Sequence, residues 1–159
     1  MDRESFIKRT KDFILSEFRE RGAMPPFAII YAEGAGRAAI VDPPQPFNDE
    51  NKAAWYDTIR ECVRTHIEDG CDADKITVVT SALAWAVTIP ADAPEAVRHL
   101  RPAASDARQE ILLVSTETAQ TVHIEFAAVR RCDDGVSLGA FASQKQATKP
   151  IGAGVGFFP

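Results

Sequence analysis

The sequence has few cysteines and lacks the motifs by which many enzymes are recognised. Its three cysteines, Cys62, Cys71 and Cys132, lie far apart and include no CxxC pair, which argues against a zinc ribbon or a redox dithiol. GxSxG, HExxH and Walker-type sequences are also absent. We therefore expect neither a structural metal nor a cofactor. Whether the protein is an enzyme stays open at this level.

Basic charge and long apolar runs are also scarce. The chain has 18 lysines and arginines against 23 aspartates and glutamates, which gives a formal net charge of −5. A nucleic-acid-binding domain usually carries a basic stripe, whereas the densest basic cluster here, Lys8, Arg9 and Lys11, is interleaved with acidic residues. The longest apolar stretch, residues 82–89, is far shorter than the ~18 residues of a membrane-spanning helix. The N-terminus does not resemble a signal peptide. These absences predict a cytoplasmic protein that binds neither nucleic acid nor membrane.

The composition itself is that of a globular domain. The chain has 159 residues, of which 45% are hydrophobic and 26% are charged, close to the average for globular proteins. A chain of about this length buries roughly 68–70% of its unfolded surface, so it needs no disulfide or metal to fold. We expect residues 1–141 to form one domain and residues 142–159 to form a glycine-containing C-terminal tail.

Two segments show helical periodicity. In residues 2–21, phenylalanine and isoleucine recur at spacings of four and seven, which is typical of a helix with one apolar stripe. Residues 48–69 form the second predicted helix, because Asn48 is a favourable N-cap residue and apolar side chains recur behind it at helical spacing. We expect the first helix to dock onto a large apolar surface through its three phenylalanines, Phe6, Phe13 and Phe18.

The remaining apolar segments have the alternation and the flanking turn residues of β-strands. The predicted strands are residues 27–31, 38–41, 75–89, 110–116, 121–129 and 136–141. Short turns join most of them, which favours antiparallel pairing. The exception is a loop at residues 91–108, with at most a helical turn or two at 93–100. The predicted fold is therefore α+β, with two layers: a mostly antiparallel sheet of about five or six strands and two main helices.

One predicted strand places a histidine and a glutamate on the same face. Val122, Ile124 and Phe126 alternate with His123 and Glu125, so we expect the apolar set to face the core and the polar pair to face away from it. His123 and Glu125 would then lie ~7 Å apart along the strand. The pair is either part of a solvated sheet face or an acid/base pair in an active site.

A second group of candidate residues surrounds the long predicted strand. Trp85 either packs in the core or anchors an interface, as exposed aromatic residues often do. Trp85 is followed along the chain by Arg101, Pro102, Asp106, Arg108, Glu110, Leu138 and Gly139. In these residues, the segment 78–141 resembles some uncharacterised bacterial proteins. The resemblance implies a small cytoplasmic bacterial protein without an assigned activity, and it adds Arg101, Asp106 and Arg108 to the candidate binding residues.

The order of the predicted elements is itself informative. A helix, a hairpin, a second helix and then several strands resemble profilin- and roadblock-like domains. That similarity implies a central antiparallel sheet flanked by helices, and it says little about function.

Three functional hypotheses follow. The first is a non-catalytic domain that binds a protein partner or assembles with itself, since the chain has no catalytic constellation but has several aromatic side chains. The second is a small hydrolase or transferase whose site comprises His123, Glu125 and the loop from Asp106 to Glu110. The third is a ligand-sensing module, which would need an apolar cavity between the sheet and a helix. A second titrating group beside His123 in one pocket would favour the enzyme. A broad apolar patch would favour the interaction domain.

Overall fold

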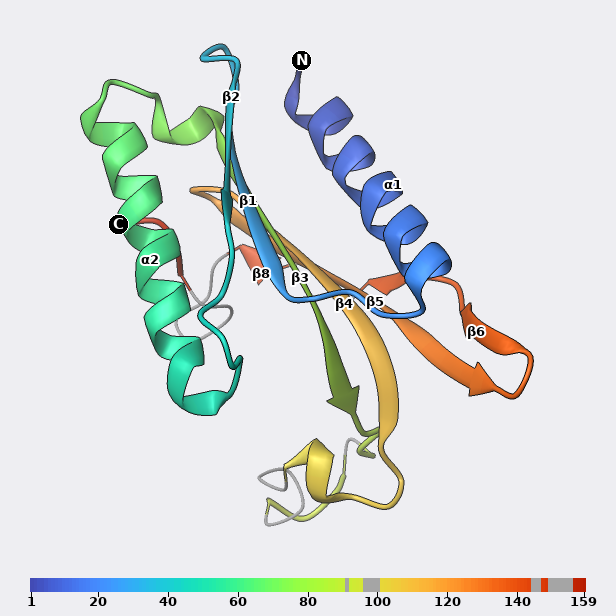
Figure 1. The fold of residues 1–159 in the computed structure, drawn as a ribbon. Coiled ribbons are helices and arrows are strands. Elements are labelled where there is room, and N and C mark those ends of the chain that lie inside the picture. The colour runs from blue at the N-terminus through green and yellow to red at the C-terminus, as the bar shows by residue number, and fades with distance from the viewer. Residues whose placement is uncertain (91, 96–100, 144–146, 149–155) are drawn as a thin grey trace.

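The computed structural model describes residues 1–90, 92–95, 101–143, 147–148 and 156–159. Within these residues the chain forms two α-helices, two short 3-10 helices and eight strands (Figure 1). In chain order they are α1 (Arg3–Arg21), β1 (Phe27–Ala32), β2 (Arg37–Val41), α2 (Asp49–Glu68), η1 (Ala73–Lys75), β3 (Ile76–Ala86), η2 (Pro102–Ala104), β4 (Gln109–Glu117), β5 (Thr121–Cys132), β6 (Gly135–Leu138), β7 (Ala142–Ser143) and β8 (Ala147–Thr148).

The strands form one antiparallel sheet in the order β2-β1-β3-β4-β5-β6, with the two-residue strands β7 and β8 paired to β5. All of the pairings given by the described residues are antiparallel. The predicted α+β class, the antiparallel sheet and the two main helices are therefore confirmed. The helical turn expected at residues 93–100 lies largely outside the described residues.

The two helices lie on opposite faces of the sheet. Along β3, Ile76 and Val78 belong to the core cluster that contains α2, whereas Val79 belongs to the cluster that contains α1. Successive side chains of a strand point to opposite faces, so each helix covers its own side, as Figure 1 shows. The sheet is thus the middle of three layers, one more than the two-layer arrangement expected from the sequence.

Helix α1 is positioned by its caps and by one row of side chains. The Asp2 carboxylate accepts a hydrogen bond from the Ser5 amide at the N-terminus, and Gly22 ends the helix at φ 68°, a conformation that glycine adopts easily. The buried residues recur at every fourth position: Phe6, Thr10, Ile14 and Phe18.

The prediction that Phe13 docks with the other two phenylalanines is wrong, because its side chain is 54% exposed. The buried row follows the i, i+4 direction and slants around the helix. Phe13 immediately precedes Ile14, so it points about 100° away from that buried side chain around the helix axis. Its ring contacts that of Phe27 in an edge-to-face arrangement, with ring centroids 6.3 Å apart.

The opposite core is built by α2 and by the C-terminal segment. Trp55, Ile59 and Val63 of α2 pack against β1 and β3, and the Trp55 indole donates a hydrogen bond to the Val41 carbonyl at 2.9 Å. Phe157 also belongs to this cluster and is 3% exposed. Its backbone amide donates to the carboxylate of the buried Glu117 at 2.7 Å. Part of the predicted tail therefore packs in the core.

Candidate functional site

Trp85 lies near the end of β3, where β3 and β4 extend beyond both helices (Figure 1). Its side chain is 44% exposed, so it does not pack in the core. The guanidinium carbon of Arg108 lies 4.7 Å from the centroid of the Trp85 ring. The same guanidinium donates to the Ala103 carbonyl at 2.8 Å, which holds it beside the 3-10 helix η2. Trp85 and Arg108 thus form an exposed cation–π pair, an arrangement found at some interfaces.

Glu110, directly opposite Trp85 in the sheet, forms a two-point ion pair with Arg131. The distances from the Arg131 Nε and Nη2 to the two Glu110 oxygens are both 2.8 Å. Arg131 also donates to the Gly22 carbonyl at 2.9 Å, which links the end of α1 to β4 and β5. The hydrogen bonds from Arg131 lower the pKa of Glu110 below its ordinary value of 4.5, against the opposing effect of partial burial.

This lowered pKa predicts a pH-dependent contribution to stability. The folded state favours the charged Glu110, so the stabilisation is present above about pH 4.5 and is lost as the pH falls through the lower folded-state value. Glu110→Gln should therefore lower the urea midpoint at pH 7, and the difference from the wild type should shrink by pH 3. Glu20→Gln, on the exposed side of α1, is the control. A difference in urea midpoint between Glu110→Gln and the wild type that stays constant with pH would contradict the prediction.

The other candidates from the second half, Arg101 and Asp106, flank the 3-10 helix η2, to which Arg108 is hydrogen-bonded. Arg101 forms an exposed ion pair with Asp49 at the start of α2, with a distance of 3.0 Å. Asp106 lies in an exposed turn between η2 and β4. Leu138 and Gly139, which also carry the resemblance, lie instead at the end of β6, beside Val129 and Ala128 of β5.

The alternation predicted for β5 is present, and Val122 is buried as predicted, at 6% exposed, but the polar pair does not face away from the core. Glu125 faces α1, where its carboxylate lies 2.7 Å from the Lys11 ammonium and its side chain is 14% exposed. His123 shares that face, with its Nε2 atom 3.8 Å from Glu125. Ile124 and Phe126, on the other face, are only half-buried. The reason is that both faces of the sheet carry a helix, so the polar face of β5 lies under α1 instead of in water.

The enzyme hypothesis grouped His123 and Glu125 with the loop that ends at Glu110. In the structure His123 lies opposite Thr116 in the sheet, and Thr116 lies six residues beyond Glu110 along β4. That separation is about 20 Å along the strand. The described residues therefore place the two parts of that candidate site at opposite ends of β4 and β5.

A feature that the sequence analysis missed is an apolar groove between α1 and the β1–β2 hairpin, which we call the α1–β2 groove. Its volume is about 640 Å³, within the range of small-ligand and peptide pockets. Alternate residues of β1 and β2 form its floor, and one side of α1 forms its wall. The lining residues include Phe6, Phe13, Met24, Phe27, Ile29, Tyr31, Ala38 and Ile40.

The groove is bordered by exposed apolar side chains, which are uncommon in such a concentration on a surface. Ile40 is 68% exposed, Met1 is 57% exposed and Phe13 is 54% exposed. Two signals in the sequence point to this surface in retrospect. Phe13 lies off the i, i+4 row of α1, and Ile40 lies on the same face of its strand as Ala38.

Comparison with known proteins adds no relative to this description, since no family model, curated protein or solved structure matches the chain. In the part of the chain that the structure describes, no helix has the length and apolar character required to cross a membrane. The same residues include no group of three histidine, cysteine, aspartate or glutamate side chains that could hold a metal ion.

Proposed function

We propose that this protein is a non-catalytic interaction domain that binds an amphipathic helix of a partner protein in the α1–β2 groove. The observation that carries the proposal is the uncovered apolar face of β1 and β2 beside α1. Ile29 is half-buried and its partner in the sheet, Ile40, is exposed. Burial of such a surface by a partner is favourable by roughly 25 cal/mol per Å² of apolar area.

The dimensions of the sheet favour a helix as the occupant. Helix α1 packs mainly on β3, β4 and β5, against Val79, Leu112, Val114 and Val129, and its Phe6 also stacks on Tyr31 of β1, with ring centroids 4.5 Å apart. A second helix packed beside α1 would lie about 8–10 Å from it, which equals about two strand spacings of 4.7–4.9 Å. In the sheet order, the strand two positions from β4 toward the open edge is β1, and the strand two positions from β3 is β2. The groove therefore lies where a neighbouring helix would pack. An extra strand paired to β2 would extend the sheet sideways and leave Ile29 uncovered.

The rim of the groove defines the polar edges of this partner. Arg9 lies on the α1 side, Asp42 lies on the β2 side, and both residues are exposed. Arg21 also lies on the α1 side, where it pairs with Glu17 at 3.0 Å. The matching helix has a leucine-rich face, an acidic residue at the edge that meets Arg9, and a basic residue at the edge that meets Asp42.

The proposal is tested with a synthetic helix of that design. An 18-residue peptide with leucines at i, i+3, i+4 and i+7 spacing, glutamates along one edge and lysines along the other is titrated into the ¹⁵N-labelled protein. We expect chemical-shift changes centred on Phe13, Ile29 and Ile40, and Ile40→Asp should weaken binding at least tenfold. The matched control is Ile89→Asp, because Ile89 is also exposed, at 36%, but lies outside the groove.

Two results would contradict this proposal. One is equal binding of a scrambled peptide of the same composition, because only the helical pattern distinguishes the two peptides. The other is a concentration-dependent dimer in light scattering that Ile40→Asp abolishes, which would assign the groove to a second copy of the chain. The enzymatic alternative stays a hypothesis, and its candidate residues are divided as described above.

A further inference from the structure

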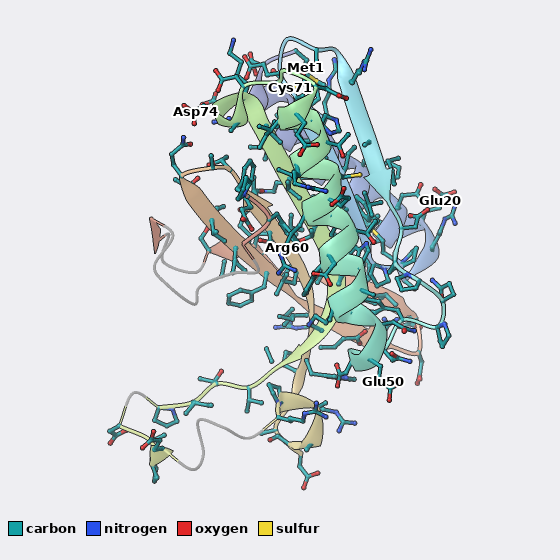
Figure 2. The ribbon with its side chains drawn as sticks, turned by 90° about the vertical axis from the view of Figure 1, so that its left-hand side faces the viewer. Met1, Glu20, Glu50, Arg60, Cys71 and Asp74 are labelled. Atoms are coloured by element: carbon teal, nitrogen blue, oxygen red, sulfur yellow. The ribbon has the colours of Figure 1, made fainter. Side chains whose placement is uncertain are left out.

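A second pocket lies on the α1 side of the sheet, near the N-terminus of α1. We call it the threonine pocket, and its volume is about 340 Å³. Its lining residues are Arg3, Ile7, Thr116, Thr118, Thr121 and His123, and none of them lines the α1–β2 groove. They come from the first turns of α1, the end of β4, the following turn and the start of β5. Figure 2 shows Met1 and Asp74 at this end of the molecule.

The hydrogen bonds of Thr118 and Thr121 leave one of their two hydroxyl groups able to donate to a ligand. The Thr118 hydroxyl oxygen accepts hydrogen bonds from the Gln120 amide at 3.2 Å and from the Thr121 amide at 3.0 Å. Both lone pairs of that oxygen are then occupied as acceptors. The Thr118 hydroxyl therefore donates its own hydrogen to the Thr121 hydroxyl oxygen, 2.9 Å away. The Thr121 hydroxyl oxygen accepts this hydrogen bond, so the Thr121 hydroxyl can donate its own hydrogen to a ligand.

Arg3 supplies an anchored positive charge at the wall of the pocket. Its Nε donates to the Thr77 hydroxyl at 2.9 Å, and its Nη2 donates to the Asp74 carbonyl. Both acceptors are neutral, so among the described residues the Arg3 charge has no carboxylate partner. A guanidinium fixed in this way, with N–H groups still available, is suited to bind an oxyanion.

His123 adds a polar atom that the described residues do not satisfy. Its Nδ1 is buried and has no hydrogen-bond partner among them, and such an atom calls for an explanation. Three carboxylates near the pocket are already bound to other donors, and one of them, Asp74, accepts a hydrogen bond from the Gln120 side chain in the turn between Thr118 and Thr121. Glu125 pairs with Lys11 at 2.7 Å, and Asp2 accepts from the Ser5 amide at 2.8 Å.

From these contacts we infer that the threonine pocket binds a small oxyanion, a phosphate or carboxylate group. Every polar side chain that lines it can donate a hydrogen bond, and none of its lining residues is acidic, although the chain as a whole has a net charge of −5. The inference is independent of the groove, because the two sites share no lining residue.

The test uses inorganic phosphate as the probe, at low ionic strength and constant pH. We expect saturable chemical-shift changes at Thr116, Thr121 and His123. Arg3→Gln and Thr121→Val should each weaken binding about tenfold, because each removes a hydrogen bond to a charged group. The matched controls are Arg19→Gln on the exposed side of α1 and Thr58→Val on α2, and both should bind phosphate like the wild type. Thermal melting of each variant confirms that it is folded, and Thr121→Val keeps the test valid if Arg3→Gln does not fold.

The inference is overturned if the shifts do not saturate, or if Arg19→Gln weakens phosphate binding as much as Arg3→Gln does. Either result would mean that phosphate only screens the surface charge. Parallel titrations with acetate and methyl phosphate identify the ligand class. Binding of methyl phosphate indicates a phosphate ester, preferential binding of acetate indicates a carboxylate, and binding of inorganic phosphate alone indicates the free ion.

Discussion

Phe18→Ala is expected to lower the free energy of unfolding by about 3–5 kcal/mol, the usual cost of truncating a fully buried phenylalanine. Phe18 is 1% exposed and packs in the core between α1 and the sheet. Surrounding side chains relax only partly into the space left by a truncated core residue, so the loss includes a cavity in addition to the lost burial. Urea denaturation followed by tryptophan fluorescence measures the change.

Phe13→Ala is the matched control on the same helix. Because Phe13 is 54% exposed, its loss should cost less than about 1 kcal/mol, while it should weaken the helix binding proposed for the α1–β2 groove. If Phe13→Ala destabilised the protein as much as Phe18→Ala does, the row of buried residues on α1 would not lie where the structure places it. A stable Phe18→Ala variant would show that α1 does not dock through this face.

Phe157→Ala is the second change with a large expected effect. Phe157 is 3% exposed, and its ring centroid lies 5.8 Å from that of Tyr56 on α2 in an edge-to-face arrangement. We expect a loss of about 3–5 kcal/mol in the free energy of unfolding, measured by urea denaturation. The backbone amide that donates to Glu117 is retained in this variant, so the experiment isolates the contribution of the ring.

The adjacent residue provides the control for Phe157. Phe158 is half-buried, so Phe158→Ala should cost less than about half as much as Phe157→Ala, in proportion to the area it covers. Unchanged stability in Phe157→Ala would show that the C-terminal segment contributes nothing to the α2-side core in solution.

Local chemistry accounts for the elements that the sequence predicted well. Helix α2 begins after its expected cap, Asn48, whose side chain accepts from Asn51, and α1 begins in the same way after Asp2, whose carboxylate accepts from Ser5. These signals are reliable because a cap bonds residues only three positions away. The predicted alternation of β5 is equally local, since neighbouring side chains of a strand must point to opposite faces.

The candidate site was less predictable, because its residues are distant in the chain. The α1–β2 groove joins Phe13 on α1 to Ile40 on an edge strand, and the threonine pocket joins Arg3 to the turn after β4. Only the docking of α1 brings these residues together. His123 could be recognised as a candidate from its place beside Glu125 in the sequence, whereas the three threonines of the pocket could not, because isolated threonines carry no spacing signal.

By itself, the sequence determined the class of the fold, the approximate extents of the helices and strands, and which side chains of each strand share a face. Those properties depend on backbone geometry and on contacts within a few residues. Only the tertiary structure decided which faces are covered. The Lys11–Glu125 pair joins residues 114 positions apart, and the bond from Arg131 to Gly22 spans 109. Phe13 became exposed and Glu125 became enclosed because α1 docked on the face of β5 that the alternation had assigned to solvent.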